Sequence, residues 1–494
     1  MNRSMSIRIT ALLCGVATCA LSVQAAPPAG LAAPRPEFHG CQIGAGDAAQ
    51  RLQALCTTIT VPEDRAHPAG QHIGLQVALL KARSSTPKSD ALFYIAGGPG
   101  QASTESFVQE AGAFDRIRSE HDVVLVDQRG TGGSNRLDCP TPASGTDQGE
   151  AAVTAAAADC LKQLRADPRF YTTTVAVQDL EQVREALGYA SVDLYGISYG
   201  TRVALQYLRA YPASVRSAIL DGVVPADLAL GPDVSLDAQR SLDLIFRRCE
   251  ADAACHRAFP DLTADFAGLQ RSLSAHPASV TLRDPLDGSP RRETLSWDKV
   301  AGAVHLMSYQ SETASLLPLL IHQAGAQHDY APLMGAALIF SSQVDEGLAG
   351  GMAAAVLCTE DAPFLKDGGD AALRDTYLGA YTLDTLQKSC RAWPRGVMAA
   401  DFKQPVVSAK PVLLLSGEDD PITPPADAER AARTLSNSLS LVVPGQGHGN
   451  VFRGCLPRIA AQFVDAGSVK GLDTACIKDI RPFPFFVNFS GPAP

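Results

Sequence analysis

The chain has 494 residues, of which 46% are hydrophobic and 19% are charged, a composition typical of globular proteins. This length predicts two or three domains, or one large domain with an insertion, and the composition excludes disordered, collagen-like and coiled-coil proteins. The chain carries 42 Lys and Arg against 52 Asp and Glu, a net charge of −10. This balance argues against nucleic-acid binding, because binding to a phosphate backbone requires a basic surface.

Residues 1–25 have the pattern of a secretory signal peptide: two arginines, an apolar run at 9–23, and a predicted cleavage position after Ala25. The apolar run contains Cys, Thr and Ser and is shorter than the roughly 20 apolar residues of a spanning helix. We therefore expect export to the periplasm or the medium without stable membrane insertion. Lipid attachment at Cys19 is the alternative. Cleavage after Ala25 would remove two arginines and no acidic residue, so the net charge would become −12.

The segments that follow predict an α/β protein. Residues 26–40 are rich in Ala, Pro and Gly and predict a flexible leader. Alternating β-branched residues at 57–65 and 72–83 predict a hairpin or paired edge strands. Helical patterns at 175–188 and 201–212 lie among short apolar runs, which are typical of parallel strands covered by helices on both faces. These six runs are 91–96, 121–127, 191–196, 217–222, 411–417 and 438–443.

A long gap separates the strands at 217–222 and 411–417. It is far longer than an ordinary connection between two strands. Hydrophobic residues within it recur at helical spacing. We therefore predict a mainly helical cap at 226–404, inserted between two parts of the core at 41–225 and 405–494.

Ten cysteines remain after the predicted cleavage, and an even number in an exported protein predicts disulfides. They fall along the chain as five neighbouring couples, and short loops close at the lowest entropic cost. We therefore predict pairing in sequence order. The couples are Cys41–Cys56, Cys139–Cys160, Cys249–Cys255, Cys358–Cys390 and Cys455–Cys476.

The predicted strand at 191–196 leads into Gly-Ile-Ser-Tyr-Gly at 196–200, which is directly followed by the helix at 201–212. This is the pattern of a nucleophile elbow, in which a strained turn exposes a serine hydroxyl. We therefore predict Ser198 as a nucleophile. A turn whose serine merely caps the helix is the alternative.

A serine hydroxyl needs a base, and a histidine base needs an orienting acid. His448 lies between glycines in the loop after the last predicted strand. Asp420 follows the strand at 411–417, which is the chain order Ser, acid, His of hydrolases with this elbow. We predict Asp420 as the acid, with Glu418 and Asp419 as rivals.

The predicted site also needs backbone donors for an oxyanion. The Gly-Gly-Pro-Gly segment at 97–100 follows a strand at the required place, so we predict the amides of Gly98 and Tyr199 as donors. The Asp-Gln-Arg-Gly turn at 127–130 fits no dinucleotide or phosphate motif and is interpreted as structural. No metal or cofactor is predicted, because His322 and His328 do not share a helix face.

These motifs together resemble the proline iminopeptidase and tripeptidyl aminopeptidase branch of the α/β-hydrolase serine peptidases. The cysteine-bearing segments resemble the exported tripeptidyl aminopeptidases more closely. One departure is Ala96, where the iminopeptidases commonly have histidine. The resemblance implies an α/β-hydrolase fold and a serine exopeptidase that releases tripeptidyl, prolyl or aminoacyl units from peptides with a free N-terminus.

A substrate ammonium entering a covered pocket must be met by carboxylates, because its desolvation is otherwise costly. Glu360 and Asp361 are adjacent acids beside a predicted disulfide, so we predict that one of them binds the amine. A solvated loop is the alternative. A secreted carboxylesterase of the same fold is the rival enzyme class, and a non-catalytic binding module is the second rival.

Overall fold

The computed structural model describes residues 35–44, 51–139, 150–365 and 371–492. The predicted signal peptide and most of the predicted leader lie outside these residues. A nine-stranded sheet has the order β1-β2-β3-β5-β4-β6-β7-β10-β11. Its strands are β1 (His39–Ile43), β2 (Leu52–Pro62), β3 (His72–Leu80), β4 (Ala91–Ile95), β5 (Asp122–Val126), β6 (Val192–Ile197), β7 (Val215–Asp221), β10 (Val412–Gly417) and β11 (Ser438–Val443).

All six strands predicted as parallel are present, and β5, β4, β6, β7, β10 and β11 pair in parallel. The predicted hairpin is confirmed as β2 and β3, which pair antiparallel from Leu55↔Leu79 to Pro62↔His72. The sequence analysis missed β1, which begins at His39, inside the segment expected to be leader. This strand pairs antiparallel with β2, and the disulfide Cys41–Cys56 joins the two strands.

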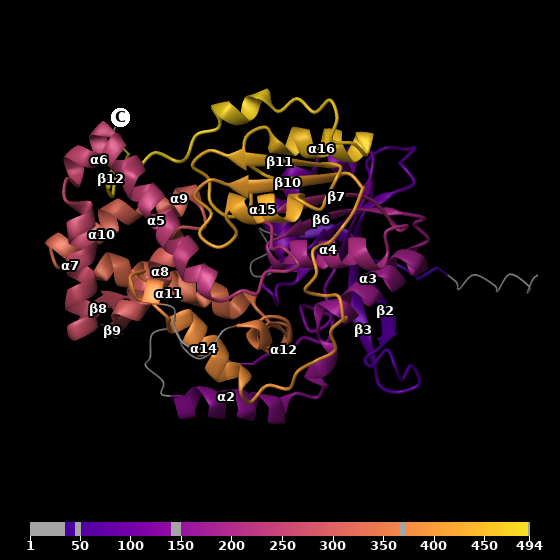
Figure 1. Ribbon diagram of the computed structural model, residues 1–494, viewed down its shortest axis with the longest axis horizontal. Helices are drawn as coiled ribbons and strands as arrows, with labels where there is room; N and C mark the ends of the chain where they lie inside the picture. Colours follow the sequence, from indigo (N-terminus) through magenta and orange to yellow (C-terminus); the bar gives the residue numbers. More distant parts are fainter. Residues whose placement is uncertain (1–34, 45–50, 140–149, 366–370, 493–494) are drawn as a thin grey trace, which may run out of the picture. The chain divides into compact units, whose positions relative to one another are not determined.

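Helices cover both faces of the sheet (Figure 1). On one face, apolar side chains of the strands pack against α3 (Thr173–Leu187), α4 (Tyr199–Ala210), α12 (Gly350–Glu360) and α15 (Pro425–Ala432). On the other face they pack mainly against α1 (Ser103–Glu110), η2 (Ala111–Phe114), η3 (Ile117–Ser119) and α16 (Leu456–Ala466). The fold is therefore α/β, as predicted, with the loops at the carboxyl ends of β4, β6, β7, β10 and β11 meeting at one edge.

The chain between β7 and β10 adds no strand to the large sheet in its described part. It is mainly helical and has its own apolar cluster; the described residues of 226–404 are called the cap below. It also contains a two-stranded sheet that the sequence analysis missed. The cap elements besides α12 are α5 (Pro232–Ala251), α6 (Ala253–Ala258), α7 (Leu262–Ala275), β8 (Ala278–Arg283), β9 (Pro290–Leu295), α8 (Trp297–Met307), α9 (Ser311–Ala314), α10 (Leu317–Ala326), α11 (Ala331–Gly347), η5 (Ala362–Phe364), α13 (Ala371–Arg374) and α14 (Tyr381–Cys390).

The end of the chain returns to the cap. After α16 and η6 (Ala475–Asp479), the short strands β12 (Phe486–Asn488) and β13 (Gly491–Pro492) pair with each other. Phe485 is buried in the apolar cluster of the cap, and the Phe486 amide donates to Ser315 O at 3.1 Å. Figure 1 shows this yellow segment running from α16 to α6. The segment 405–494, which was expected to belong wholly to the core, thus also packs against the cap at its end.

The remaining elements are α2 (Glu150–Gln163) and η4 (Pro168–Phe170), which lie between β5 and α3.

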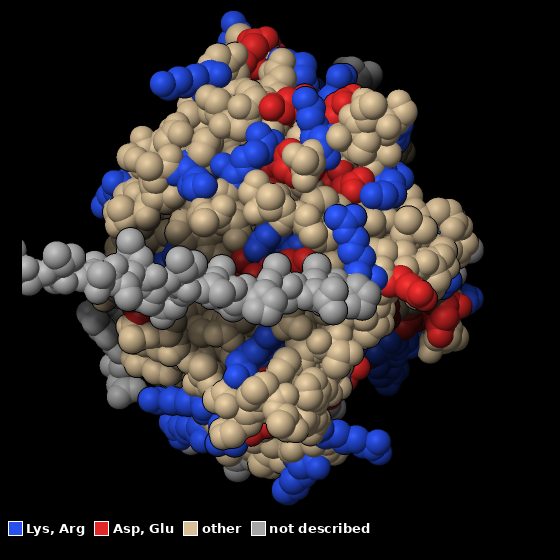
Figure 2. All heavy atoms as spheres, turned by 90° about the vertical axis from the view of Figure 1, so that its right-hand side faces the viewer, with Lys and Arg blue, Asp and Glu red and all other residues tan. Residues whose placement is uncertain are grey.

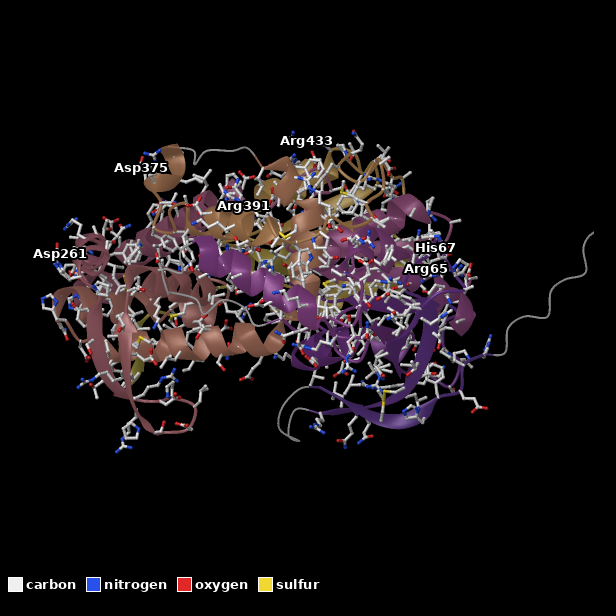
Figure 3. The ribbon with its side chains drawn as sticks, turned by 90° about the horizontal axis from the view of Figure 1, so that it is seen from below. Arg65, His67, Asp261, Asp375, Arg391 and Arg433 are labelled. Atoms are coloured by element: carbon white, nitrogen blue, oxygen red, sulfur yellow. A yellow bond between two sulfur atoms is a disulfide. The ribbon has the colours of Figure 1, made fainter. Side chains whose placement is uncertain are left out.

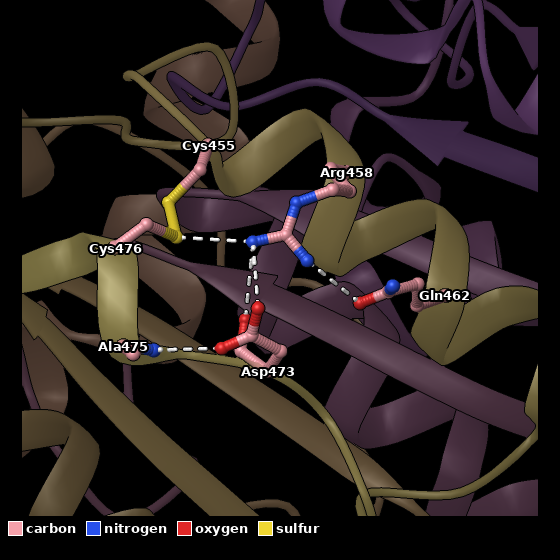
Figure 4. The surroundings of a disulfide bond; sticks show 6 residues. All are labelled: Cys455, Arg458, Gln462, Asp473, Ala475 and Cys476. Carbon is pink, nitrogen blue, oxygen red and sulfur yellow. Dashed lines mark hydrogen bonds and ion pairs between the residues drawn. A yellow bond between two sulfur atoms is a disulfide. The ribbon is translucent and has the colours of Figure 1, made fainter.

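All five predicted cysteine couples are disulfides in the structure. Figure 4 shows Cys455–Cys476 joining the start of α16 to η6. There Arg458 donates to Cys476 Sγ at 3.2 Å and to Asp473 O at 3.3 Å. Such cross-links fit an exported protein, because disulfides persist in oxidising compartments.

Charges of both signs are interspersed on the face seen in Figure 2. Figure 3 places Asp261 and Asp375 on the cap, and Arg65 and His67 on the opposite side, in the connection between β2 and β3. Within the described ranges, no helix is both long enough and apolar enough to cross a bilayer.

Candidate active site

Ser198 sits between β6 and α4 with φ 56° and ψ −127°, a backbone conformation that side chains rarely adopt. The turn depends on its glycines. A Cβ at Gly196 would overlap the backbone oxygen of Gly200, and a Cβ at Gly200 would overlap that of Ile95. The Ser198 amide donates to Asp221 O at 2.8 Å. The sequence therefore forms a strained elbow between strand and helix, with Ser198 only partly buried.

The Gly-rich loop after β4 lies against this elbow. A Cβ at Gly97 would be 2.9 Å from the Cβ of Ser198, and Gly98 has a φ of 101° that favours glycine. Tyr199 is the first residue of α4, so its amide has no acceptor within the helix. The two predicted oxyanion donors thus lie on segments adjoining Ser198. Asp127, which follows β5, accepts from the amide and the hydroxyl of Thr104 in the first turn of α1 at 2.9 and 3.0 Å.

His448 and Asp420 lie together at the ends of β11 and β10. Nδ1 of His448 is 2.9 Å from Oδ2 of Asp420, and the Asp420 carboxylate is fully buried. Asp420 also accepts from the amides of Ile422 and Thr423 at 3.0 and 2.9 Å. The histidine loop adjoins the serine elbow, since a Cβ at Gly449 would be 2.9 Å from Cδ1 of Ile197.

The two rivals of Asp420 have other partners. Glu418 accepts from the Gly445 amide at 2.8 Å, and Asp419 forms an ion pair with Arg248. This geometry supports Asp420 as the acid.

The electrostatics of the pair stabilise a charged histidine. Burial alone would lower the pKa of His448, but the charge of Asp420 and the hydrogen bond to it raise this pKa above its ordinary value. Burial alone would raise the pKa of Asp420, but His448 and the backbone donors hold it below its ordinary value. The arrangement can accept a proton from a serine hydroxyl and hold the resulting imidazolium.

Thr423 is a site residue that the sequence analysis missed. Its hydroxyl is 2.9 Å from Oδ2 of Asp420 and 3.0 Å from Nδ1 of His448. It donates to the carboxylate and lies within reach of the imidazole N–H. Its place three residues after Asp420 was the available signal, because a threonine there closes a turn onto the aspartate.

The cap contacts the histidine loop directly. The His448 amide donates to Tyr309 O at 2.6 Å, and Gln310 Nε2 donates to His448 O at 2.8 Å. The rings of Tyr309 and His448 meet edge to face at 5.2 Å. No local pattern could have found these partners, because they lie about 140 residues from His448 in the chain.

Helix α5 of the cap contacts the acid loop. Arg240 donates to Glu418 O at 2.9 Å and to Asp420 O at 2.7 Å. Ser241 donates to Asp419 O at 2.5 Å. At the oxyanion loop, the Ala349 amide donates to Gly100 O at 2.9 Å. The cap therefore supports several loops of the candidate site rather than only covering them.

Glu360 and Asp361 lie in a buried ionic cluster and not at an open pocket. Both side chains have no exposed surface. Asp361 accepts two hydrogen bonds from Arg202, and Lys403 Nζ lies 3.3 Å from it. Glu360 accepts from the amide and hydroxyl of Thr173 at 2.7 and 2.8 Å. Neither carboxylate is exposed for the predicted binding of a substrate amine. To reach them, a substrate ammonium would have to displace Arg202 or Thr173.

One group of possible metal ligands occurs within the described residues, formed by Asp90, His121 and Asp193. Arg216 lies 2.9 Å from a carboxylate oxygen of each aspartate. Its guanidinium already supplies the positive charge there. The group lies at the start of β4 and β6, away from Ser198.

A largely parallel sheet that carries a serine elbow, followed by an acid and then a histidine on later strands, defines an α/β hydrolase. A profile of the alpha/beta hydrolase fold matches residues 90–454. The chain belongs to this family and is a hydrolase.

Three relatives with known names are similar to the chain. Serine protease Hip1 of Mycobacterium tuberculosis is 24% identical over 468 residues, which cover 86% of this chain and 87% of the relative. Carboxylesterase B of the same species is 27% identical over 474 residues, which cover 87% of each. Tripeptidyl aminopeptidase of Streptomyces lividans is 28% identical over 188 residues, which cover 34% of this chain and 35% of the relative.

Proposed function

We propose that the protein is an exported serine exopeptidase that releases short units from the free N-terminus of peptides. The observation that carries the serine mechanism is the strained elbow of Ser198 beside the paired His448 and Asp420. Relatives named serine protease and tripeptidyl aminopeptidase support peptides as the substrate class. The motif resemblance to the iminopeptidase and tripeptidyl aminopeptidase branch supports action at the N-terminus.

In this proposal the reaction has two acyl-transfer steps. The Ser198 hydroxyl attacks the scissile carbonyl while His448 accepts its proton and Asp420 orients the imidazolium. The amides of Gly98 and Tyr199 donate to the oxyanion. His448 then protonates the leaving amine, and water activated by His448 releases the acyl group from Ser198.

Product analysis on a peptide mixture tests this function. The same peptides are offered with free and with acetylated N-termini, and the products are identified by mass spectrometry. We expect N-terminal fragments of one to three residues from the free peptides only. Ser198→Ala protein prepared in parallel is the control, and its kcat should fall by about 10⁴-fold or more. Equal cleavage of acetylated peptides would contradict the exopeptidase proposal.

A carboxylesterase is the second candidate, favoured by a relative of that name that matches 87% of the chain. The same serine, histidine and acid can hydrolyse esters as readily as amides. The ratio of kcat/KM for a tripeptidyl anilide to that for a short-chain ester separates the two. An ester preference that is insensitive to blocking the substrate amine would favour the esterase.

A further inference from the structure

Asp221, the last residue of β7, contacts both the serine elbow and the histidine loop. Its backbone oxygen accepts from the Ser198 amide at 2.8 Å. Its carboxylate accepts from the Asn450 amide at 2.9 and 2.8 Å and from the Val451 amide at 2.7 Å. These amides follow His448 by two and three residues. One residue thus joins the chain segments of the nucleophile and the base.

The neighbouring backbone is equally confined. Gly222 has a φ of 66°, and a Cβ there would be 2.8 Å from Cε1 of His448 and 3.0 Å from Oγ1 of Thr423. The end of β7 therefore packs directly against the catalytic imidazole. A shift of Asp221 would therefore displace the backbone that packs against the His448 ring.

The Asp221 carboxylate is buried with hydrogen-bond donors rather than a cation. Its exposed fraction is 0%, and its third donor is the hydroxyl of Tyr195 at 3.1 Å. Burial raises the pKa of Asp221 to about 6, against the opposing effect of its backbone donors. Tyr195 stacks on Tyr94, whose hydroxyl donates to Glu110 at 3.1 Å. Burial and Asp221 raise the pKa of Glu110 to about 8, so Glu110 is mostly protonated at pH 7.

We propose that Asp221 is a positioning residue of the reaction, which fixes the His448 loop against the Ser198 elbow and adds a second negative charge near the imidazolium. The proposal rests on the triad of the proposed function but on no particular substrate. The titratable groups that affect His448 are Asp420, Asp221, Glu110, which is mostly protonated at pH 7, and the half-buried His305 on α8.

The test is Asp221→Asn, measured with an uncharged activated ester and with a serine-directed phosphonate. Asparagine keeps the size but turns an N–H group toward the backbone amides of the histidine loop. We expect kcat to fall by about 10–100-fold with KM little changed, since hydrogen bonds to charged groups are involved. The acid limb of the kcat/KM profile should move to lower pH, because removing a negative charge lowers the pKa of His448.

Asp193→Asn is the matched control. Asp193 is a buried aspartate at the other end of the neighbouring strand β6, bonded to Ser217 and Arg216. It should lower the thermal midpoint without moving the acid limb. An Asp221→Asn protein with wild-type labelling rate and an unmoved acid limb would overturn the proposal. Failure of the wild-type protein to be labelled at Ser198 would instead overturn the proposed function.

Tyr195→Phe covers the case in which Asp221→Asn does not fold. It removes one donor from the Asp221 carboxylate, so the pKa of Asp221 should rise further. The negative charge near His448 is then partly lost, so kcat should fall and the acid limb should move to lower pH, as in Asp221→Asn. An acid limb and a kcat equal to those of the wild type would overturn the proposal.

Discussion

Arg202 and Asp361 form a bidentate ion pair, with Nη1 of Arg202 2.9 Å from Oδ2 of Asp361 and Nη2 2.8 Å from Oδ1. Arg202 lies on α4, one turn after Ser198, and Asp361 follows α12 of the cap. Neither side chain is exposed. The pair therefore joins the helix that follows Ser198 to the cap.

The first prediction is that Asp361→Asn strongly destabilises the protein. It leaves the buried guanidinium of Arg202 without its main counter-ion, and breaking a buried pair in this way costs about 3–5 kcal/mol. Urea unfolding measures the loss. Asp401→Asn is the control, because the Arg209–Asp401 pair is largely exposed at Asp401 and should contribute less than about 1 kcal/mol. Equal losses in both variants would contradict the assignment.

The second prediction concerns Glu360→Gln. Burial raises the pKa of Glu360 to about 7, against the charge of Arg202, and both carboxylate oxygens accept from Thr173. The Thr173 hydroxyl in turn lies 2.6 Å from the hydroxyl of Tyr199. We therefore expect the variant to change kcat equally for substrates with free and with acylated amines.

The amine-binding role suggested by the sequence predicts a different outcome for Glu360→Gln. KM would rise for free amines only. Measuring kcat and KM on matched ester substrates with and without a free amine separates the two interpretations. A KM increase confined to the free amine would restore Glu360 as the amine ligand.

The strands and the loops that form the candidate site could be predicted because their signals are local. The run 411–417 is apolar because β10 is buried on both faces, and Asp420 follows it directly. The Gly-Ile-Ser-Tyr-Gly segment can be recognised in the sequence because α4 lies so close to β6 that only glycine fits at positions 196 and 200.

The cap contacts could not be predicted in the same way. Periodicity in α5 shows which face is apolar, but it does not reveal that Arg240 donates to the acid loop. The strand β9 is Pro-Arg-Arg-Glu-Thr-Leu, which is mostly exposed and lacks the apolar alternation that signals a strand. Likewise, nothing near Asp361 in the sequence indicates Arg202 as its partner, since the two are 159 residues apart.

The third prediction is a pH dependence set by His448. Only the neutral imidazole accepts the serine proton, so kcat/KM should rise with pH through the pKa of His448. Asp420 raises this pKa above the ordinary value of about 6.5. Asp420→Asn should therefore move the acid limb to lower pH while lowering kcat by about 10⁴-fold. An uncharged ester is the proper substrate, because its own titration does not enter; an unmoved limb would contradict the assignment of Asp420.

The fourth prediction is that the Thr423 hydroxyl contributes to catalysis through Asp420 and His448. Thr423→Val keeps the shape of the side chain but removes the donor to Oδ2 of Asp420, so kcat should fall by about 10-fold or more. Thr423→Ser keeps the hydroxyl and is the control, with kcat expected within about 3-fold of the wild type. Stopped-flow labelling by a phosphonate measures the serine reactivity directly. If valine and serine variants reacted equally fast, the hydroxyl would have no part in orienting the pair, and the turn at Ile422 and Thr423 would hold Asp420 through its backbone amides alone.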